Sequence, residues 1–322
     1  MTPTAVQQRL AAYADLARWA PSKHNTQPWR FVVRDNALEL WTDNQRELRE
    51  TDPHGRERHI SLGAALQIAC VAARARGYEP QVRLFPDGND GPVALLTEAG
   101  AHDCTADDLA LLAAVPFRRT DRGPLDAGPL SAGLPYELQL AASEHGAVLR
   151  LVKSPGDRAT LARLVEQADR VLVTAGAADR ELSPWLRAVG DVSGDGVPSG
   201  NTRGAAASYR AEFVQRDFSR QYSLPAQDRT GRDAPLVGIL CTPRDAVGDW
   251  LAAGRALTAV LLRAAVAGAQ ASYLNQPVEL PALRQLLSEH LGLPGFAQLV
   301  LRVGAGGDVA APPRRADVVL LA

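Results

Sequence analysis

Lysine is nearly absent from this sequence of 322 residues, because only Lys23 and Lys153 occur among its 35 basic residues. Any anion that the protein binds is therefore expected to meet arginine side chains or backbone amides. The 36 acidic residues balance the basic ones and leave a formal net charge of −1. Without a basic surplus, we expect no nucleic-acid partner.

Cysteine is also scarce, and Cys70, Cys104 and Cys241 lie far apart in the sequence. An odd number of separated cysteines argues against a disulfide framework and favours a reducing compartment. No cationic stretch followed by an apolar segment opens the chain. The most apolar segment, 257–271, contains Arg263 and is too short to span a bilayer. We expect a cytoplasmic protein with no membrane partner.

Several catalytic motifs are missing as well. The sequence has neither the phosphate-binding loop of nucleotide hydrolases nor the Gly-x-Ser-x-Gly elbow of serine hydrolases. The glycine cluster at Gly304 lacks the strand and helix that a dinucleotide fingerprint requires. His54 and His59 have no cysteine or further histidine near them, so no metal site is expected.

What the sequence does contain is hydrophobic periodicity of both kinds, which predicts helices and strands in one chain. The stretch 181–232 has weak periodicity and many glycines, and a segment of that kind is more often a lid or an insertion than a plain connector. Helices are predicted at 4–20, 60–76, 103–114, 130–145, 156–176, 248–270 and 279–291, and strands at 29–33, 37–41, 81–85, 93–97, 147–152, 236–240 and 298–303.

Two of the predicted helices resemble each other. Residues 62–77 and 253–268 are both rich in small residues, share a Gly-x-Ala-Leu core and end in glycine. Two buried, alanine-rich helices could look alike by composition alone. The alternative is a duplication in which each half of the chain carries one central helix.

A polar loop lies between the first predicted helix and strand. It presents several short polar side chains between two prolines, which could contact a polar heteroaromatic ligand at little entropic cost. Turn formation and capping would explain the same residues. The residues in question are Pro21, Ser22, His24, Asn25, Gln27 and Pro28.

Arginine is concentrated at two further points. Arg118, Arg119 and Arg122, with Thr120, could chelate a phosphate through guanidinium forks and a hydroxyl. A solvated basic turn, in which Asp121 pairs internally, is the alternative.

Two later segments could complete such a site. Arg314 and Arg315 could supply a second arginine contribution to the same phosphate, or belong to a polar tail. The segment 272–279, with Asn275, Gln276 and Pro277, could aim backbone N–H groups into a pocket or simply connect two helices.

In this order, the four segments resemble the nitroreductase family of flavin enzymes, and residues 20–31 carry the strongest likeness. The length and order are similar to the fused-repeat branch typified by the mycobacterial Acg protein. The resemblance implies an α+β fold of two fused repeats that imitates the family homodimer, with central mixed or antiparallel sheets flanked by helices. The halves would be 1–114 and 115–322, with 181–232 as a lid over the flavin and Trp185, Tyr209 and Phe213 as covers.

The resemblance also implies one FMN site per chain, between the halves, with NAD(P)H as electron donor. Chemistry at N5 of the flavin requires no side chain as acid or base, so no catalytic residue is predicted. The residues expected to bind FMN are Pro21, Ser22, His24, Asn25, Gln27, Arg118, Arg119, Thr120, Arg122, Asn275, Gln276, Pro277, Arg314 and Arg315.

The implied function is an FMN-dependent oxidoreductase that transfers hydride between NAD(P)H and a conjugated, nitroaromatic or quinone-like small molecule. Two alternatives remain: an FMN-sequestering protein with little turnover, and a dehydrogenase or oxidase of a natural-product pathway. The chain would act as a monomeric pseudo-dimer or associate further with copies of itself.

Overall fold

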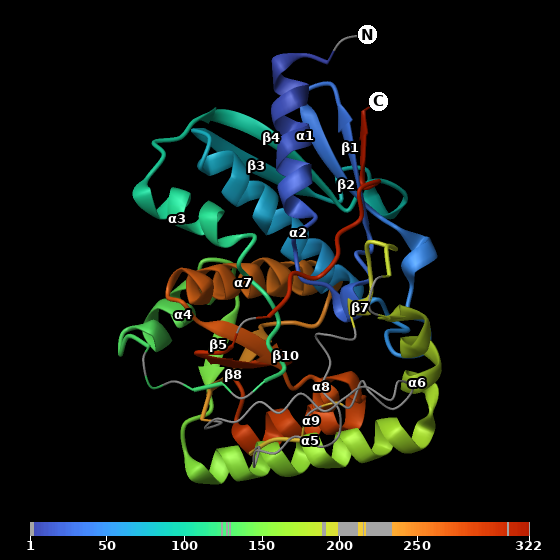
Figure 1. The fold of residues 1–322 in the computed structure, drawn as a ribbon, viewed down its shortest axis with the longest axis vertical. Helices are drawn as coiled ribbons and strands as arrows, with labels where there is room; N and C mark the ends of the chain where they lie inside the picture. Colours follow the sequence, from blue (N-terminus) through green and yellow to red (C-terminus); the bar gives the residue numbers. More distant parts are fainter. Residues whose placement is uncertain are drawn as a thin grey trace.

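The computed structural model describes residues 3–123, 125, 126, 128, 130–188, 191–198, 212–214, 216, 234–307 and 309–321. They form an α+β fold, as predicted (Figure 1). The helices are α1 (Ala5–Ala17), α2 (Arg56–Arg74), α3 (Ala106–Ala114), α4 (Leu134–Ser143), α5 (Pro155–Ala175), α6 (Ala177–Leu182), α7 (Val247–Val266), α8 (Gln276–Glu279) and α9 (Pro281–Leu291). The strands are β1 (Trp29–Arg34), β2 (Ala37–Thr42), β3 (Tyr78–Leu84), β4 (Ala94–Ala101), β5 (Val148–Leu151), β6 (Leu186–Arg187), β7 (Val197–Pro198), β8 (Leu236–Thr242), β9 (Gln270–Tyr273), β10 (Phe296–Gly304) and β11 (Val319–Leu321). Four 3-10 turns are η1 (Lys23–Asn25), η2 (Asn44–Arg46), η3 (Gly88–Asp90) and η4 (Ser183–Trp185).

Helix ends follow the local sequence. Thr4 and Thr105 begin α1 and α3 with capping boxes, in which the threonine side chain accepts a backbone N–H that the helix leaves unpaired. Ser154 caps α5 in a similar way, directly before a proline at the first helical position. The predicted turn between β1 and β2 forms at Asp35, whose φ of 51° is left-handed.

Two sheets of the same topology make up most of the molecule. The first has the strand order β11-β1-β2-β4-β3, and the second has the order β5-β8-β10-β9. All neighbours are antiparallel except β11, which pairs in parallel with β1. Without β11, each sheet has four strands, and in both sheets the spatial order is first, second, fourth and third strand along the chain.

Helices α2 and α7 cross between the two sheets, with one sheet above and one below them in Figure 1. Their closest approach is at two glycines. A Cβ on Gly63 would lie 2.1 Å from the carbonyl oxygen of Leu251, and a Cβ on Gly254 would lie 2.0 Å from that of Ile60. The same offset in sequence relates Gly63 to Gly254 and Ile60 to Leu251, so the contact is reciprocal.

The C-terminal segment joins the two sheets. It leaves β10 in the second sheet and climbs beside α1 to end as β11 at the edge of the first (Figure 1). Residues 319–321, which fall in the predicted second half, therefore complete the sheet of the first. On its far face, the second sheet is covered by α5, α8 and α9, whose apolar residues form a separate core cluster.

Most predicted elements form within a few residues of the expected bounds, but the region after α7 is an exception. The prediction of a helix to residue 270 is wrong, because α7 ends at Val266 and Gly268 takes a left-handed φ of 74° that leads into β9. Neither β9 nor β11 was predicted. Both strands are short, so the alternation of apolar and polar residues within them is too brief to be recognised in the sequence.

The predicted lid is described only in part, since residues 189, 190, 199–211, 215 and 217–232, with Tyr209, lie outside the described residues. Phe213 is buried against the α5 side of the second sheet, and Trp185 lies beneath Arg46 and Arg187.

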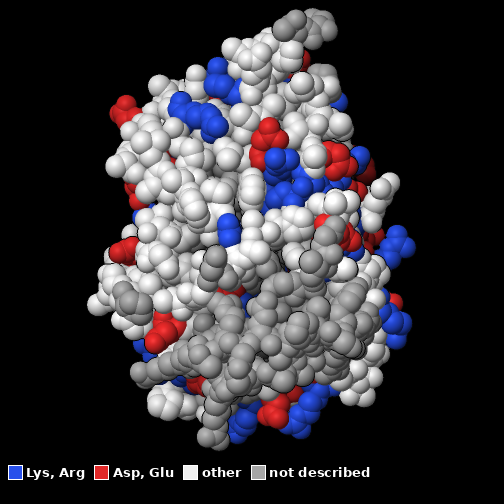
Figure 2. All heavy atoms as spheres, in the orientation of Figure 1, with Lys and Arg blue, Asp and Glu red and all other residues white. Residues whose placement is uncertain are grey.

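Figure 2 shows acidic and basic side chains interspersed on one face of the molecule. Within the ranges that the structure describes, none of the helices combines the length and the apolar character that a membrane span requires.

Candidate functional site

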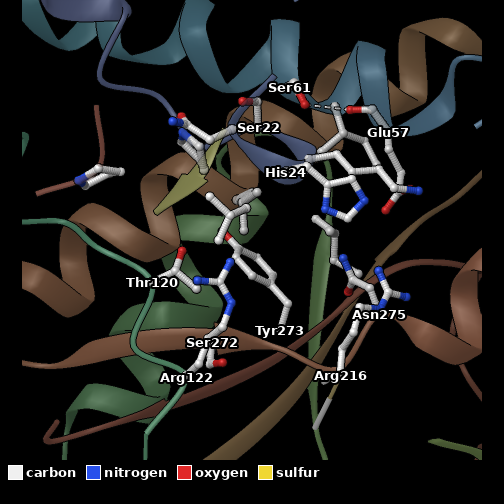
Figure 3. A pocket seen from close by; sticks show the side chains of 18 of the residues that line it. Ser22, His24, Glu57, Ser61, Thr120, Arg122, Arg216, Ser272, Tyr273 and Asn275 are labelled. Atoms are coloured by element: carbon white, nitrogen blue, oxygen red, sulfur yellow. Dashed lines mark hydrogen bonds and ion pairs between the residues drawn. The ribbon is translucent and has the colours of Figure 1, made fainter. Parts of the chain in front are cut away.

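A cavity of about 170 Å³ lies between the loop before β1, the central helices α2 and α7, and strands β9 and β10 of the second sheet. Figure 3 shows Ser22, His24, Glu57 and Ser61 on one side of it and Tyr273 across from them. The first side belongs to η1 and α2, and the opposite side to β9 and the residues after it. The predicted site residues that line the cavity are Pro21, Ser22, His24, Asn25, Arg118, Thr120, Arg122, Asn275, Gln276 and Arg314.

Four predicted residues lie outside the described lining. Gln27 and Arg315 bond each other beneath the loop, where the Arg315 backbone N–H donates to Gln27 Oε1 at 3.0 Å. Arg315 also pairs with Asp43 at 3.1 Å. Arg119 donates to the carbonyl oxygen of Val309, and Pro277 is buried within α8. These contacts support the walls of the cavity.

The loop before β1 is held in a strained conformation. His24, Asn25 and Gln27 have φ values of 50°, 55° and 50°, in the left-handed region that residues with a Cβ rarely adopt. The backbone N–H of Gln27 donates to Ser22 Oγ at 2.9 Å, which closes the loop on itself. Strain of this kind persists only where surrounding contacts enforce it, and it concentrates at functional sites.

Asn25 enforces that conformation by bonding two distant segments. Its Nδ2 donates to the carbonyl oxygens of Gly196 at 2.9 Å and Pro313 at 3.0 Å, and its Oδ1 accepts from Arg314. Gly196 N–H returns a bond to the Asn25 carbonyl at 3.2 Å. As a result, Gly196 and Val197 form part of the cavity wall.

One end of the cavity concentrates positive charge. Arg118 Nη2 and Arg314 Nη2 both donate to the carbonyl oxygen of Trp19, at 3.2 and 3.0 Å. Within the described part of the chain, neither guanidinium pairs with a carboxylate, and the Nε atom of each is buried without a partner. Burial and the neighbouring Arg118 lower the pKa of Arg314 well below its ordinary value. Two buried, uncompensated arginines are a site for an anion.

Arg122 and Thr120 line the same cavity. Burial lowers the pKa of Arg122 to about 10, which still leaves it charged at neutral pH. Figure 3 shows the Arg122 side chain next to the Tyr273 ring, and Thr120 farther from the ring on the same side.

The opposite end holds a network of charges that the sequence analysis missed. Lys23 Nζ bonds Glu57, lies 3.8 Å from Glu279 and donates to the Thr51 carbonyl at 3.0 Å. Arg216 Nη2 pairs with Glu279 at 2.6 Å. All four charged side chains line the cavity. One signal could have found Lys23, because a lone lysine beside a candidate histidine in a lysine-poor chain is unusual.

The network sets the protonation states around it. Burial raises the pKa of Glu279, but Arg216 and Lys23 outweigh burial and hold it at about 2. Burial raises the pKa of Glu57, which Lys23 only partly offsets. Burial and Lys23 lower the pKa of His24 well below its ordinary value, so its imidazole is neutral at neutral pH. Burying paired charges of this kind is tolerated only when each partner is present.

This arrangement suits a polar ligand with one anionic end. The unpaired arginines would hold the anion, and the neutral His24 ring with the amides of Asn275 and Gln276 would face the rest. Neither a nucleophile paired with a base nor a group of three metal-ligating side chains occurs among the described residues of the site.

Comparison with known proteins gives relatives that match over most of their length, although no family model matches the chain. The chain is 36% identical over 293 residues to "Putative NAD(P)H nitroreductase Rv3131" of Mycobacterium tuberculosis, spanning 90% of this chain and 83% of that protein. It is 32% identical over 308 residues to "Putative NAD(P)H nitroreductase acg" of the same organism, spanning 92% of this chain and 89% of that one. A third relative, "Uncharacterized protein Rv3127", is 29% identical over 304 residues.

Identities above 30% across nearly the whole of both chains reflect common descent, and they agree with the likeness seen in the polar loop and the arginine segments. The chain therefore belongs to the nitroreductase family and resembles its Acg-like members.

Proposed function

We propose that the protein is an FMN-dependent oxidoreductase of the nitroreductase type, with one FMN bound in the cavity between its halves. The observation that carries this proposal is the pair of buried arginines, Arg118 and Arg314, which no described carboxylate neutralises. A phosphate group would compensate both charges and accept from their unpartnered Nε atoms. Membership of the nitroreductase family supports a flavin as the bearer of that phosphate.

The residues present fit such a cofactor. Arg118, Arg314, Arg122 and Thr120 would hold the phosphate, and the loop around His24 and the amides of α8 would face the ring system. Bound FMN would supply hydride transfer between NAD(P)H and a conjugated, nitroaromatic or quinone-like small molecule. The chain's own part is to bind, to orient and to exclude water, since Gly196 and Val197 close one wall.

We further propose that the two halves are fused repeats that imitate a homodimer. Three observations support this: the matching strand order of the two sheets, the similar central helices, and the reciprocal approach of Gly63 and Gly254. A reciprocal contact is what a two-fold axis between identical subunits would produce.

A second candidate function is storage of FMN with little turnover. The observation that favours it is the segment around Gly196, which Asn25 holds in the cavity wall with two hydrogen bonds. Arg216, which follows the segment in sequence, adds an ion pair to Glu279. A wall held so firmly would slow exchange of both cofactor and substrate.

The proposal is tested by the absorption spectrum of the purified protein with FMN and by arginine variants. We expect a flavin spectrum, and we expect Arg118→Met or Arg314→Met to weaken FMN binding about 10- to 100-fold, because each change removes a charge-assisted contact. Arg244→Met is the matched control, because the Arg244 side chain is 83% exposed. Wild-type protein that retains no flavin absorbance after incubation with FMN and removal of the free FMN contradicts the proposal.

Adding NADPH and then a quinone or nitroaromatic separates the two candidates. Repeated bleaching and recovery of the flavin absorbance supports an oxidoreductase. A bound flavin that does not bleach, or bleaches once and does not recover, favours storage.

A further inference from the structure

The hydroxyl group of Tyr273 is buried in the cavity wall without a hydrogen-bond partner among the described residues. Strand β9 fixes the residue, since Tyr273 lies opposite Leu301 of β10 in the ladder. A buried hydroxyl that lacks a partner destabilises the folded protein, because it has lost its hydrogen bonds to water. Such a group in a folded protein requires an explanation, and at a cavity the simplest one is a ligand.

The surroundings of this hydroxyl indicate what the ligand atom would be. Burial raises the pKa of Tyr273, whereas the positive charges of Arg118 and Arg122 act in the opposite direction. Figure 3 shows the Arg122 side chain next to the tyrosine ring. The hydroxyl therefore stands in a field that favours a negatively charged acceptor.

Within the described ranges, no protein group accepts a hydrogen bond from this hydroxyl. Arg118 already bonds the Trp19 carbonyl through Nη2, and its Nε is also buried and unpartnered. Thus Tyr273 and Arg118 present two unused donors to one cavity from different elements, β9 and the segment after α3. A phosphate oxygen could accept from both, whereas a neutral ribityl or ring atom would leave the arginine charge uncompensated.

We propose that Tyr273 donates a hydrogen bond to the phosphate of the bound flavin and thereby makes the site select FMN over riboflavin. The inference rests on the proposed function, which supplies the flavin. It adds a residue from the second sheet that the arginine motifs do not contain.

The test compares Tyr273→Phe with wild type for binding of FMN and riboflavin, measured by quenching of flavin fluorescence. We expect the variant to bind FMN about 10-fold more weakly, because it loses a hydrogen bond to a charged group, and to bind riboflavin as wild type does. Tyr136→Phe is the matched control, since Tyr136 is 70% exposed. Unchanged FMN affinity overturns the inference, and so does an equal loss for both flavins, which would place the contact on the ribityl chain or the ring.

Thermal unfolding of the ligand-free variant gives a second readout. Removal of a hydroxyl that has no protein partner should leave the midpoint unchanged or raise it. Inorganic phosphate should raise the midpoint of wild type more than that of the variant. A variant that unfolds at a clearly lower temperature or fails to fold overturns the inference, because the hydroxyl would then be structural.

Failure of the proposed function would look different. In that case, wild-type protein binds neither flavin, so there is no FMN or riboflavin affinity on which the effect of Tyr273→Phe could be measured. The inference alone fails when wild type binds FMN and Tyr273→Phe binds it equally well.

Discussion

At the scale of single residues, Lys23 contributes most clearly to both stability and site structure. Its ammonium bonds Glu57 and lies within 3.8 Å of Glu279, and its side chain is 7% exposed. Removing one partner of a buried ion pair is expensive, because the other charge stays buried without compensation. Lys23 therefore compensates buried negative charge, whereas the second lysine, Lys153, is exposed.

We predict that Lys23→Met lowers the free energy of unfolding by about 3–5 kcal/mol at neutral pH, whereas Lys153→Met leaves it within about 0.5 kcal/mol of wild type. Urea denaturation of the two variants measures the difference. Equal stability of both variants would show that the carboxylates find other compensation.

The same network predicts how stability depends on pH. Glu279 has a pKa of about 2 in the folded protein against 4.5 for an ordinary glutamate, so its contribution is present above pH 4.5 and is lost as the pH falls toward 2. Without Lys23, the buried carboxylates should take up protons more readily. The destabilisation by Lys23→Met should accordingly be smaller at pH 5 than at pH 8, and the reverse order would contradict the assigned pairing.

At the scale of elements, the crossing of α2 and α7 decides how closely the two halves approach. The backbones meet where Gly63 and Gly254 leave no room for a Cβ, and Thr258 Oγ1 donates across the crossing to the Ala64 carbonyl at 3.1 Å. The carbonyl oxygens that a new methyl group would meet are backbone atoms, which cannot move without shifting a helix.

Gly63→Ala and Gly254→Ala should each lower the free energy of unfolding by about 1–3 kcal/mol or more, because overpacking outweighs the gain in helix propensity. The two losses should be similar, since the contacts are reciprocal. Gly248→Ala is the control, because a Cβ there meets nothing within 4 Å. Thermal or urea unfolding measures the stabilities of the three variants. If Gly248→Ala is destabilised as much as Gly63→Ala and Gly254→Ala, the prediction is wrong.

At the scale of the whole molecule, the two halves share a topology but not a site. The connection between α1 and β1 runs over residues 18–28 and carries the polar loop, whereas its counterpart between α4 and β5 has only residues 144–147. The arginine segment at 118–122 likewise occurs once in the sequence. The strand order of the sheets therefore occurs twice, whereas the residues that line the cavity are not repeated.

We predict one FMN per chain at saturation. Extraction of the flavin from protein loaded with excess FMN, with absorbance compared against protein concentration, gives the ratio. A value near two would mean that the short loop also completes a site.

The sequence by itself determined the elements with strong periodicity and the identities of the polar residues. The buried helix α2 and most strands were predictable because their apolar spacing extends over many residues. The polar loop and the arginine segments were visible because such side chains at close spacing have few purely structural uses. Apolar spacing and clusters of polar residues can both be read within a short stretch of sequence, without knowledge of which distant segment packs against it.

Tertiary structure decided which of those residues share a cavity. Asn25 was predicted to reach a ligand, and in the fold its side chain also bonds Gly196, Pro313 and Arg314. Gln27 and Arg315 bond each other behind the loop. The network of Lys23 with Glu57 and Glu279 draws on parts of the chain more than 200 residues apart. Burial, charge pairing and the unused hydroxyl of Tyr273 depend on what lies opposite each side chain, and only the packing of the two halves determines that.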